Sequence, residues 1–328
     1  MVSIYYITPV ISCQQLKYIK KSVILRKIMS EQIYKRLTNG RECDRINIRK
    51  IKRYYMKNLQ NLHTHSRFCD GENTVEEMIL AAIDKGFDSI GFSGHSYMFY
   101  TAPDHSMSIE GTEEYKREVR RLAKVYRDKI DVFCGLEFDM YSQIDLSGYD
   151  YIIGSVHYLK IGDEYVGFDR AASVVKGVID KYFDGDGMRY AKAFYATVPQ
   201  LPKYGKIDVL GHFDLITKHC ENENFFDPTS PEYLKYAKEA IDSLVGKVPF
   251  FEVNTGAIAR NYRTTPYPSL ELMKEFKERG FGAVISSDCH NASYLDIAFE
   301  DAAEMLRSCG FTERYILTKN GFKAVPLG

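Results

Sequence analysis

Short motifs rich in histidine and carboxylate residues recur along this chain, and their residue types are those that bind divalent metal ions. Two of these motifs are dense: N-L-H-T-H-S-R-F-C-D-G begins at Asn61 and I-S-S-D-C-H begins at Ile285. Imidazole and carboxylate groups suit zinc, manganese and iron. The candidate ligands are His63, His65, Asp70, His95, Glu137, His157, His212, Asp288 and His290.

These ligands are too many for one ion and about right for two or three, so the sequence predicts a cluster of divalent ions. Such a cluster commonly hydrolyses phosphate esters with a metal-bound hydroxide, and we therefore expect a hydrolase. A lone histidine on an apolar strand is more often a core residue, but six motifs together are not explained that way. His105 and His219 lack this context and are expected to be ordinary residues. Three aspartates near the motifs fit either as orienters of ligand histidines or as surface charges: Asp139, Asp145 and Asp214.

The elements that must position these residues alternate in type from Leu59 onward. Strand patterns fall at 59–63, 89–92, 131–137, 151–157, 207–212, 250–254, 282–286 and 315–318. Helical patterns separate them, at 74–86, 112–129, 171–183, 188–201, 231–245, 269–279 and 295–308. This alternation predicts βα units on a parallel sheet. Each candidate ligand lies at the carboxyl end of a strand or just after it.

Barrel folds place their active sites at that end of the strands. Seven or eight βα units that close into a barrel bring all six motifs to one rim, whereas an open doubly wound sheet focuses ligands at a single switch point. We therefore predict an α/β barrel. His63 and His65 are two residues apart, so both rings should point to one face of the strand, and Asp288 and His290 repeat that spacing.

Composition fits a globular protein, with 45 % apolar and 27 % charged residues. No apolar run approaches the roughly 18 residues that span a bilayer, so no membrane association is expected. The seven cysteines include no C-x-x-C pair. Reduced thiols are the simplest interpretation, and they indicate a cytoplasmic protein.

Charge divides the chain unevenly. Residues 1–57 hold 14 Lys/Arg against three acidic residues, a net of +11, which leaves 30 basic and 41 acidic residues in the remainder. We expect residues 1–55 to be a basic extension of little or no fold, or an over-long gene start, and residues 56–328 to be the barrel domain. A targeting or nucleic-acid-binding arm and a solvated charged tail are the alternatives.

The extension is expected to be dispensable, because it carries none of the motifs. A chain that begins at Met56 should fold and retain full activity, which soluble expression, circular dichroism and turnover would measure. Loss of soluble expression on truncation would mean that the segment packs on the barrel.

Taken together, H-T-H…D-G, G-H-S, L-E, S-V-H-Y, G-H-F-D and S-S-D-x-H resemble the polymerase and histidinol phosphatase (PHP) superfamily, over Met56 to the C-terminus. S-V-H-Y-L, G-H-F-D-L-I-T-K, E-V-N-T-G-A…R with a following P-Y-P, and I-S-S-D-C-H resemble its histidinol-phosphatase branch. There are two departures from the family pattern. Gly94 stands where the second motif usually has an acidic residue, which removes a carboxylate beside His95, and N-T-G replaces N-T-S-G.

The resemblance implies a distorted (βα)₇ TIM-like barrel that holds three metal ions. It implies three ligand groups: His63, His65, Glu137 and Asp288 for the first ion, His157 and His212 with the bridging Glu137 for the second, and Asp70, His95 and His290 for the third. Three divalent ions carry +6 and the three carboxylates −3. A phosphate dianion and one hydroxide supply the remaining −3, so the site should favour a monoester over a diester.

The resemblance further implies a phosphomonoesterase that converts L-histidinol phosphate to L-histidinol in histidine biosynthesis. Glu137 and Asp288 are then catalytic, with an arginine that absorbs charge on the phosphoryl oxygens. Arg260 is the first choice for that arginine, with Arg170 and Arg263 as weaker candidates. The partner is a small phosphorylated amino alcohol and no nucleic acid, since the barrel region is acidic. A nucleotide phosphatase or exonuclease of the same superfamily is the alternative, and a non-catalytic metal-binding module is a third.

Overall fold

A computed structural model describes residues 58–102 and 105–327 of the chain. Its centre is a parallel sheet in the order β1-β2-β3-β4-β7-β8-β9. The strands are β1 (Gln60–Asn61), β2 (Ser89–Phe92), β3 (Asp131–Asp139), β4 (Tyr151–Ser155), β7 (Val209–Leu210), β8 (Phe250–Asn254) and β9 (Gly282–Ser286).

Beyond the ends of β1 and β9 the two edges of this sheet meet. Thr64 and Cys289 form a parallel bridge, in which the His65 N–H donates to the Cys289 carbonyl at 2.9 Å and the Cys289 N–H donates to the His63 carbonyl at 3.2 Å. The sheet is thereby closed into a distorted seven-stranded α/β barrel, as the sequence predicted.

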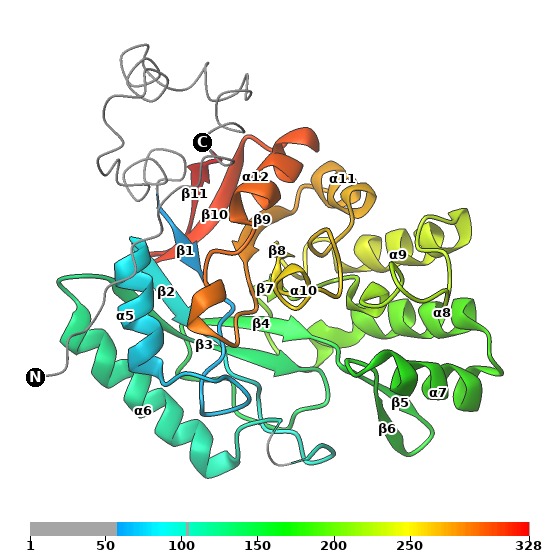
Figure 1. Cartoon of the computed structure of the whole chain (residues 1–328), viewed down its shortest axis with the longest axis horizontal. Helices are drawn as coiled ribbons and strands as arrows, with labels where there is room; N and C mark the ends of the chain where they lie inside the picture. Colours follow the sequence, from blue (N-terminus) through cyan, green and yellow to red (C-terminus); the bar gives the residue numbers. More distant parts are fainter. Residues whose placement is uncertain (1–57, 103–104, 328) are drawn as a thin grey trace, which may run out of the picture. The chain divides into compact units, whose positions relative to one another are not determined.

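Helices lie around the outside of the barrel (Figure 1). The first begins at a capping box, in which Thr74 and Glu77 each accept from the other's backbone N–H, and it ends at Gly86 with φ +80°; both features follow the predicted signals. The helices are α5 (Val75–Lys85), α6 (Ile109–Tyr126), α7 (Ala172–Phe183), α8 (Gly187–Thr197), α9 (Pro231–Leu244), α10 (Gly256–Ala259), α11 (Leu270–Glu278) and α12 (Phe299–Ser308). None of the described helices is long and apolar enough to cross a membrane.

The barrel interior is filled below the rim by the ring of Tyr151. A Cβ on Gly135 would lie 2.2 Å from that ring, and one on Gly91 2.3 Å from its hydroxyl, so both strands need glycine there. The other buried members of this inner layer are Leu62, Phe133, Ile153, Val209, Val284 and Leu317.

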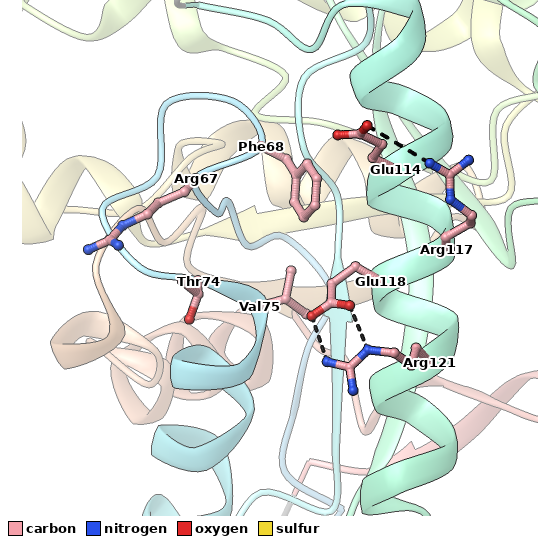
Figure 2. Close-up of a pocket in the computed structure, with 8 residues that line it drawn as sticks. All are labelled: Arg67, Phe68, Thr74, Val75, Glu114, Arg117, Glu118 and Arg121. Atoms are coloured by element: carbon pink, nitrogen blue, oxygen red, sulfur yellow. Dashed lines mark hydrogen bonds and ion pairs between the residues drawn. The ribbon is translucent and has the colours of Figure 1, made fainter.

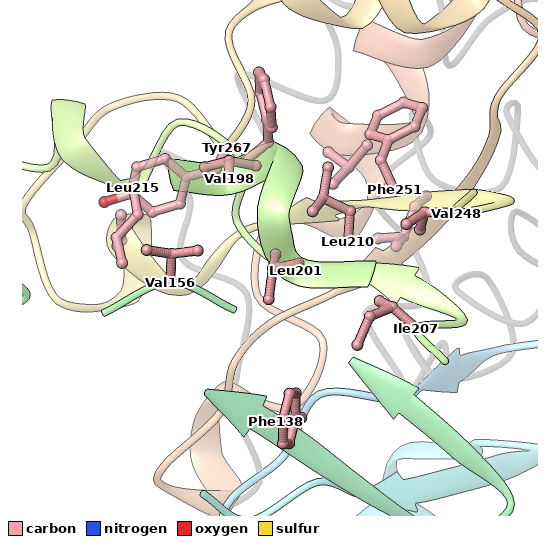
Figure 3. Close-up of a cluster of buried hydrophobic side chains, with 14 of the residues drawn as sticks. Phe138, Val156, Val198, Leu201, Ile207, Leu210, Leu215, Val248, Phe251 and Tyr267 are labelled. Atoms are coloured by element: carbon pink, nitrogen blue, oxygen red, sulfur yellow. The ribbon is translucent and has the colours of Figure 1, made fainter. Parts of the chain in front are cut away.

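A second, larger core lies between the strands and the helices. Figure 3 shows part of it, where Leu210 and Phe251 from the strands gather with Leu201 and Ile207. These two apolar layers fix the strands, and with them the loops that carry the candidate ligands.

The structure corrects three details of the predicted elements. The run at 315–318 is not a further βα strand, because β10 (Glu313–Thr318) pairs antiparallel with β11 (Gly321–Pro326) in a separate hairpin. A second hairpin, β5 (Tyr158–Ile161) and β6 (Glu164–Gly167), lies between β4 and α7 and was not predicted. The last helix begins at Phe299 rather than at Leu295. Pairing partners outside the barrel decide both hairpins, and local patterns do not reveal them.

Candidate metal centre

Glu137 lies at the centre of the predicted cluster, near the end of β3, and is 1 % exposed. Its Oε2 lies 2.9 Å from His95 Nδ1, 3.3 Å from His63 Nε2 and 3.5 Å from His65 Nε2. This oxygen therefore faces ligand atoms that come from two different loops of the barrel rim.

The other carboxylate oxygen of Glu137 faces a second group. Oε1 lies 3.0 Å from His212 Nε2 and 3.4 Å from His157 Nε2, and it accepts a hydrogen bond from the Ser155 hydroxyl at 2.7 Å. The two histidine nitrogens are 3.2 Å apart. One carboxylate thus joins two sets of histidines, which is the geometry of a bridging ligand.

Asp288 completes the set around His63 and His65. Its Oδ1 lies 3.1 Å from His65 Nε2 and 3.6 Å from His63 Nε2, so His63 and His65 share one face as predicted. Asp288 has φ +47°, an unfavourable conformation for a residue with a side chain. The backbone is held there by the bridge between Thr64 and Cys289.

A third group forms at Asp70. Its carboxylate lies 3.3 Å from His290 Nε2, 3.5 Å from His65 Nδ1 and 3.6 Å from His95 Nε2. All nine predicted side chains are therefore brought together. Three subsets have ligand atoms within 4.8 Å of one another: His65, Asp70, His95 and His290; His63, His65 and Asp288; and His95, Glu137 and His157.

The atoms that converge fit metal ions better than they fit one another. Buried nitrogen and oxygen atoms normally have hydrogen-bond partners. His63 Nε2, His65 Nε2, His95 Nδ1 and Glu137 Oε2 are buried and make no hydrogen bond, although Glu137 Oε2 lies only 2.9 Å from His95 Nδ1. Ligand atoms in a tetrahedral site lie about 3.3 Å from one another, given bonds of about 2.0–2.1 Å to the ion. The separations around Glu137 are close to that value.

Burial and neighbouring charges set the protonation of the candidate ligands. Burial, together with His290 and His95, lowers the pKa of His65 to about 3, so this imidazole is neutral and one of its ring nitrogens has a free lone pair. Burial alone would raise the pKa of Glu137, but the surrounding histidines hold it well below its usual range. A neutral imidazole and an ionised carboxylate are the forms that bind metal. Burial alone would lower the pKa of His63, His95 and His212, but the carboxylates around them raise it, so these rings release protons when an ion binds.

Two buried carboxylates orient the histidines from behind. Glu252 lies 2.9 Å from His63 Nδ1 and also accepts from the His212 backbone N–H at 2.7 Å. Asp139 lies 3.2 Å from His157 Nδ1. Of the two roles considered from the sequence, this contact favours the orienter of a ligand histidine over a surface charge. Because these carboxylates contact the Nδ1 atoms of His63 and His157, the Nε2 atoms of these two rings face the centre.

The remaining polar candidates lie outside the centre. Asp214 is buried, accepts from the Ser269 N–H at 2.9 Å and lies 3.6 Å from Arg263 Nη1, and Asp145 is exposed. Neither belongs to the ligand groups of the described residues. His105 and His219 contact Arg170 instead, at 2.8 Å from Nη1 and 2.7 Å from the carbonyl, and neither belongs to the three ligand groups found among the described residues.

The three arginines considered from the sequence differ in position. Arg260 Nη2 lies 3.2 Å from Asp288 Oδ2, and Nη1 lies 3.2 Å from His290 Nδ1, with one third of the side chain exposed. Arg263 is buried and stacks over the Tyr267 ring at 4.6 Å. Arg260 is therefore the arginine that is in contact with the cluster and also open to solvent.

Gly94 is the first of the two departures from the family pattern, and its surroundings explain how the chain tolerates it. A Cβ at this position would lie 3.3 Å from Cys69 Sγ and 3.4 Å from Met107 Cε. The space beside the backbone is thus occupied by these two side chains. Cys69 Sγ in turn lies 3.5 Å from His65 Nδ1.

A surface groove lies between the loop after β1 and helix α6 (Figure 2). Two of its three arginines form local ion pairs: Arg121 Nε lies 2.8 Å from Glu118 Oε2, and Arg117 lies 4.0 Å from Glu114. Arg67 Nε donates to the Glu72 carbonyl. The groove includes none of the nine candidate ligands, so it is separate from the centre.

The sequence of this chain matches those of known proteins. The family model described as PHP domain matches residues 61–256. A protein of Deinococcus radiodurans named "Probable histidinol-phosphatase" is 29 % identical over 266 residues, which cover 78 % of this chain and 95 % of that protein. The "Histidinol-phosphatase" of Bacillus subtilis is 25 % identical over 259 residues, covering 73 % and 96 %.

A solved structure shares the fold. The histidinol phosphate phosphatase of Lactococcus lactis subsp. lactis, in complex with zinc, L-histidinol and phosphate, superposes with a TM-score of 0.63 at 22 % identity. The match covers 81 % of this chain and 99 % of that one.

Proposed function

This chain belongs to the PHP domain family, and on that basis we propose that it is a metal-dependent phosphomonoesterase that hydrolyses L-histidinol phosphate to L-histidinol and phosphate in histidine biosynthesis. The observation that carries the proposal is the convergence of nine metal-binding side chains on one barrel rim, with buried ligand atoms that lack any other partner. The relatives named histidinol-phosphatase support the substrate, because they align over nearly their whole length.

The nine side chains would hold two or three divalent ions, and zinc, manganese and iron suit this donor set. Glu137 bridges the two histidine groups that face its two oxygens, and Asp288 belongs with His63 and His65. Asp70 gathers His95 and His290. His65 and His95 each belong to two of the three ligand groups, so they connect these groups.

Divalent ions in such a centre supply Lewis acidity toward the phosphoryl oxygens and lower the pKa of water. The chain itself contributes the rest. Arg260, whose Nη groups contact Asp288 and His290, would donate hydrogen bonds to the phosphoryl oxygens. Glu252 and Asp139 hold the orientation of the His63 and His157 rings. Three carboxylates balance half the charge of three divalent ions, and this balance favours a dianionic monoester over a monoanionic diester.

The partner in this proposal is a small phosphorylated amino alcohol rather than nucleic acid. We place the enzyme in the cytoplasm, because the five cysteines of the described residues are all free thiols, which suits a reducing compartment. The acidic balance of the barrel region disfavours the exonuclease alternative.

The proposal predicts a clear substrate preference. Phosphate release from L-histidinol phosphate should exceed that from nucleoside monophosphates and sugar phosphates by at least about tenfold in kcat/KM, equivalent to about 1.4 kcal/mol. A DNA oligomer should not be cleaved. If a nucleotide or sugar phosphate were preferred by the same factor, the substrate assignment would be wrong while the metal centre could still stand.

A further inference from the structure

A tyrosine hydroxyl lies behind one of the two carboxylates that orient the histidines. Tyr100 donates a hydrogen bond to Asp139 Oδ1, while Asp139 Oδ2 lies 3.2 Å from His157 Nδ1 and accepts from the His157 backbone N–H at 3.1 Å. Asp139 is 1 % exposed. These residues form a continuous chain of contacts that ends at the ring whose Nε2 faces Glu137 and His212.

The ring of Tyr100 is itself held in place. It stacks on Tyr165 of β6 with centroids 4.4 Å apart and planes at 13°, and it meets Tyr158 of β5 edge-on at 4.9 Å. Tyr158 directly follows His157 in the chain. The β5–β6 hairpin therefore fixes where the hydroxyl lies, through ring contacts that do not depend on the hydroxyl.

The same arrangement occurs at the other carboxylate. The Ser286 hydroxyl donates to Glu252 Oε2, and Glu252 lies against His63 Nδ1. In both cases a hydroxyl donor occupies a carboxylate that orients a histidine, and so restricts the rotation of that carboxylate. Outer partners of this kind typically change metal affinity or activity by 10–100-fold when they are removed.

Tyr100 also connects two parts of the centre. It lies on the loop after β2, five residues beyond His95, and His95 and His157 meet ring edge to ring face with centroids 5.3 Å apart. The loop that brings His95 to the centre thus also reaches the partner of His157.

We propose that Tyr100 is a positioning residue that, through Asp139, fixes the His157 ring and thereby sets the affinity of the His157–His212 part of the centre for a divalent ion. The inference rests on the proposed ligand role of His157. It concerns the hydroxyl alone, because the aromatic contacts of Tyr100 survive its removal.

The test is Tyr100→Phe in the full chain. Metal-free protein is titrated with Zn²⁺ by calorimetry, and kcat/KM for L-histidinol phosphate is measured at limiting and at excess Zn²⁺. One equivalent should bind about 10–100-fold more weakly than in wild type. kcat/KM should fall at limiting Zn²⁺ and recover at excess Zn²⁺, a rescue that a general loss of structure would not give.

Two further variants serve as matched controls. Tyr165→Phe removes a hydroxyl from the ring stacked on Tyr100 and should bind Zn²⁺ as wild type does. Asp139→Asn should weaken the same equivalent at least as much as Tyr100→Phe, and the double variant should be no weaker than Asp139→Asn, because both changes act through one chain of contacts.

Wild-type Zn²⁺ affinity in Tyr100→Phe would overturn the inference, as would an equal loss in Tyr165→Phe or additive losses in the double variant. Failure of Tyr100→Phe to fold would also overturn it, since the hydroxyl would then serve the fold. His157→Ala separates this inference from the proposed function. If His157→Ala leaves metal binding intact, the ligand assignment falls; if it loses an equivalent and Tyr100→Phe does not, only the role of Tyr100 falls.

Discussion

Replacing Glu137 with alanine should reduce phosphate release by a factor on the order of 10³ or more, because groups that act as a unit lose most of their effect together. The two oxygens of Glu137 face separate histidine groups, with His95 on one side and His212 on the other. Its replacement removes a carboxylate ligand from both histidine groups at once. Metal analysis after reconstitution should show fewer bound equivalents than in wild type.

The fold should survive this change. Glu137 lies among histidines and Ser155 rather than in the apolar layers, so circular dichroism of the metal-free variant should match that of wild type. Glu113→Ala, at an exposed position of α6, is the matched control and should keep full activity and metal content. Near-normal turnover in Glu137→Ala would mean that the centre has been assigned to the wrong residues.

Replacing Arg260 with alanine should have the next largest effect. Its guanidinium lies 3.2 Å from both Asp288 Oδ2 and His290 Nδ1 while one third of the side chain is exposed, so it can turn toward a phosphoryl group without leaving the centre. Removing a donor that stabilises developing charge costs on the order of 2–4 kcal/mol. We expect kcat to fall and KM to rise, and inorganic phosphate to inhibit less strongly as a product.

Arg260→Lys should recover part of this loss and no more, because an ammonium group cannot reproduce the two-pronged donor geometry of a guanidinium. Arg117→Ala, at an exposed position on α6, controls for a simple change of net charge. If Arg260→Ala retained the kinetics of wild type while L-histidinol phosphate remained the preferred substrate, the arginine clamp would be excluded and the rest of the site would stand.

The sequence was sufficient to predict the nine side chains that meet. Their residue types are unusual at strand ends, and closure of the barrel brings the carboxyl ends of all its strands to one rim. The sequence was also sufficient for the barrel, since alternating elements leave few topologies. Glu252 was missed as a site residue. A signal was present, because Glu252 and Asn254 alternate on the otherwise apolar strand β8, and both must point into the barrel interior.

Other features depend on contacts that a linear pattern does not contain. Tyr100 reaches Asp139 only because the loop after β2 packs on the β5–β6 hairpin. His95 presents Nδ1 to Glu137 and Nε2 to Asp70, an orientation fixed by the packing of three loops. The tail expected at residues 1–55 lies outside the described residues, and its dispensability stays a prediction.

The central claim is that a centre of at least two divalent ions performs the hydrolysis of L-histidinol phosphate. Its most direct test is stepwise addition of Zn²⁺ or Mn²⁺ to the metal-free protein while phosphate release from L-histidinol phosphate is measured. Activity should stay near zero up to one equivalent, rise beyond it, and reach a plateau at two to three equivalents. Full activity with one equivalent or with none would contradict the account.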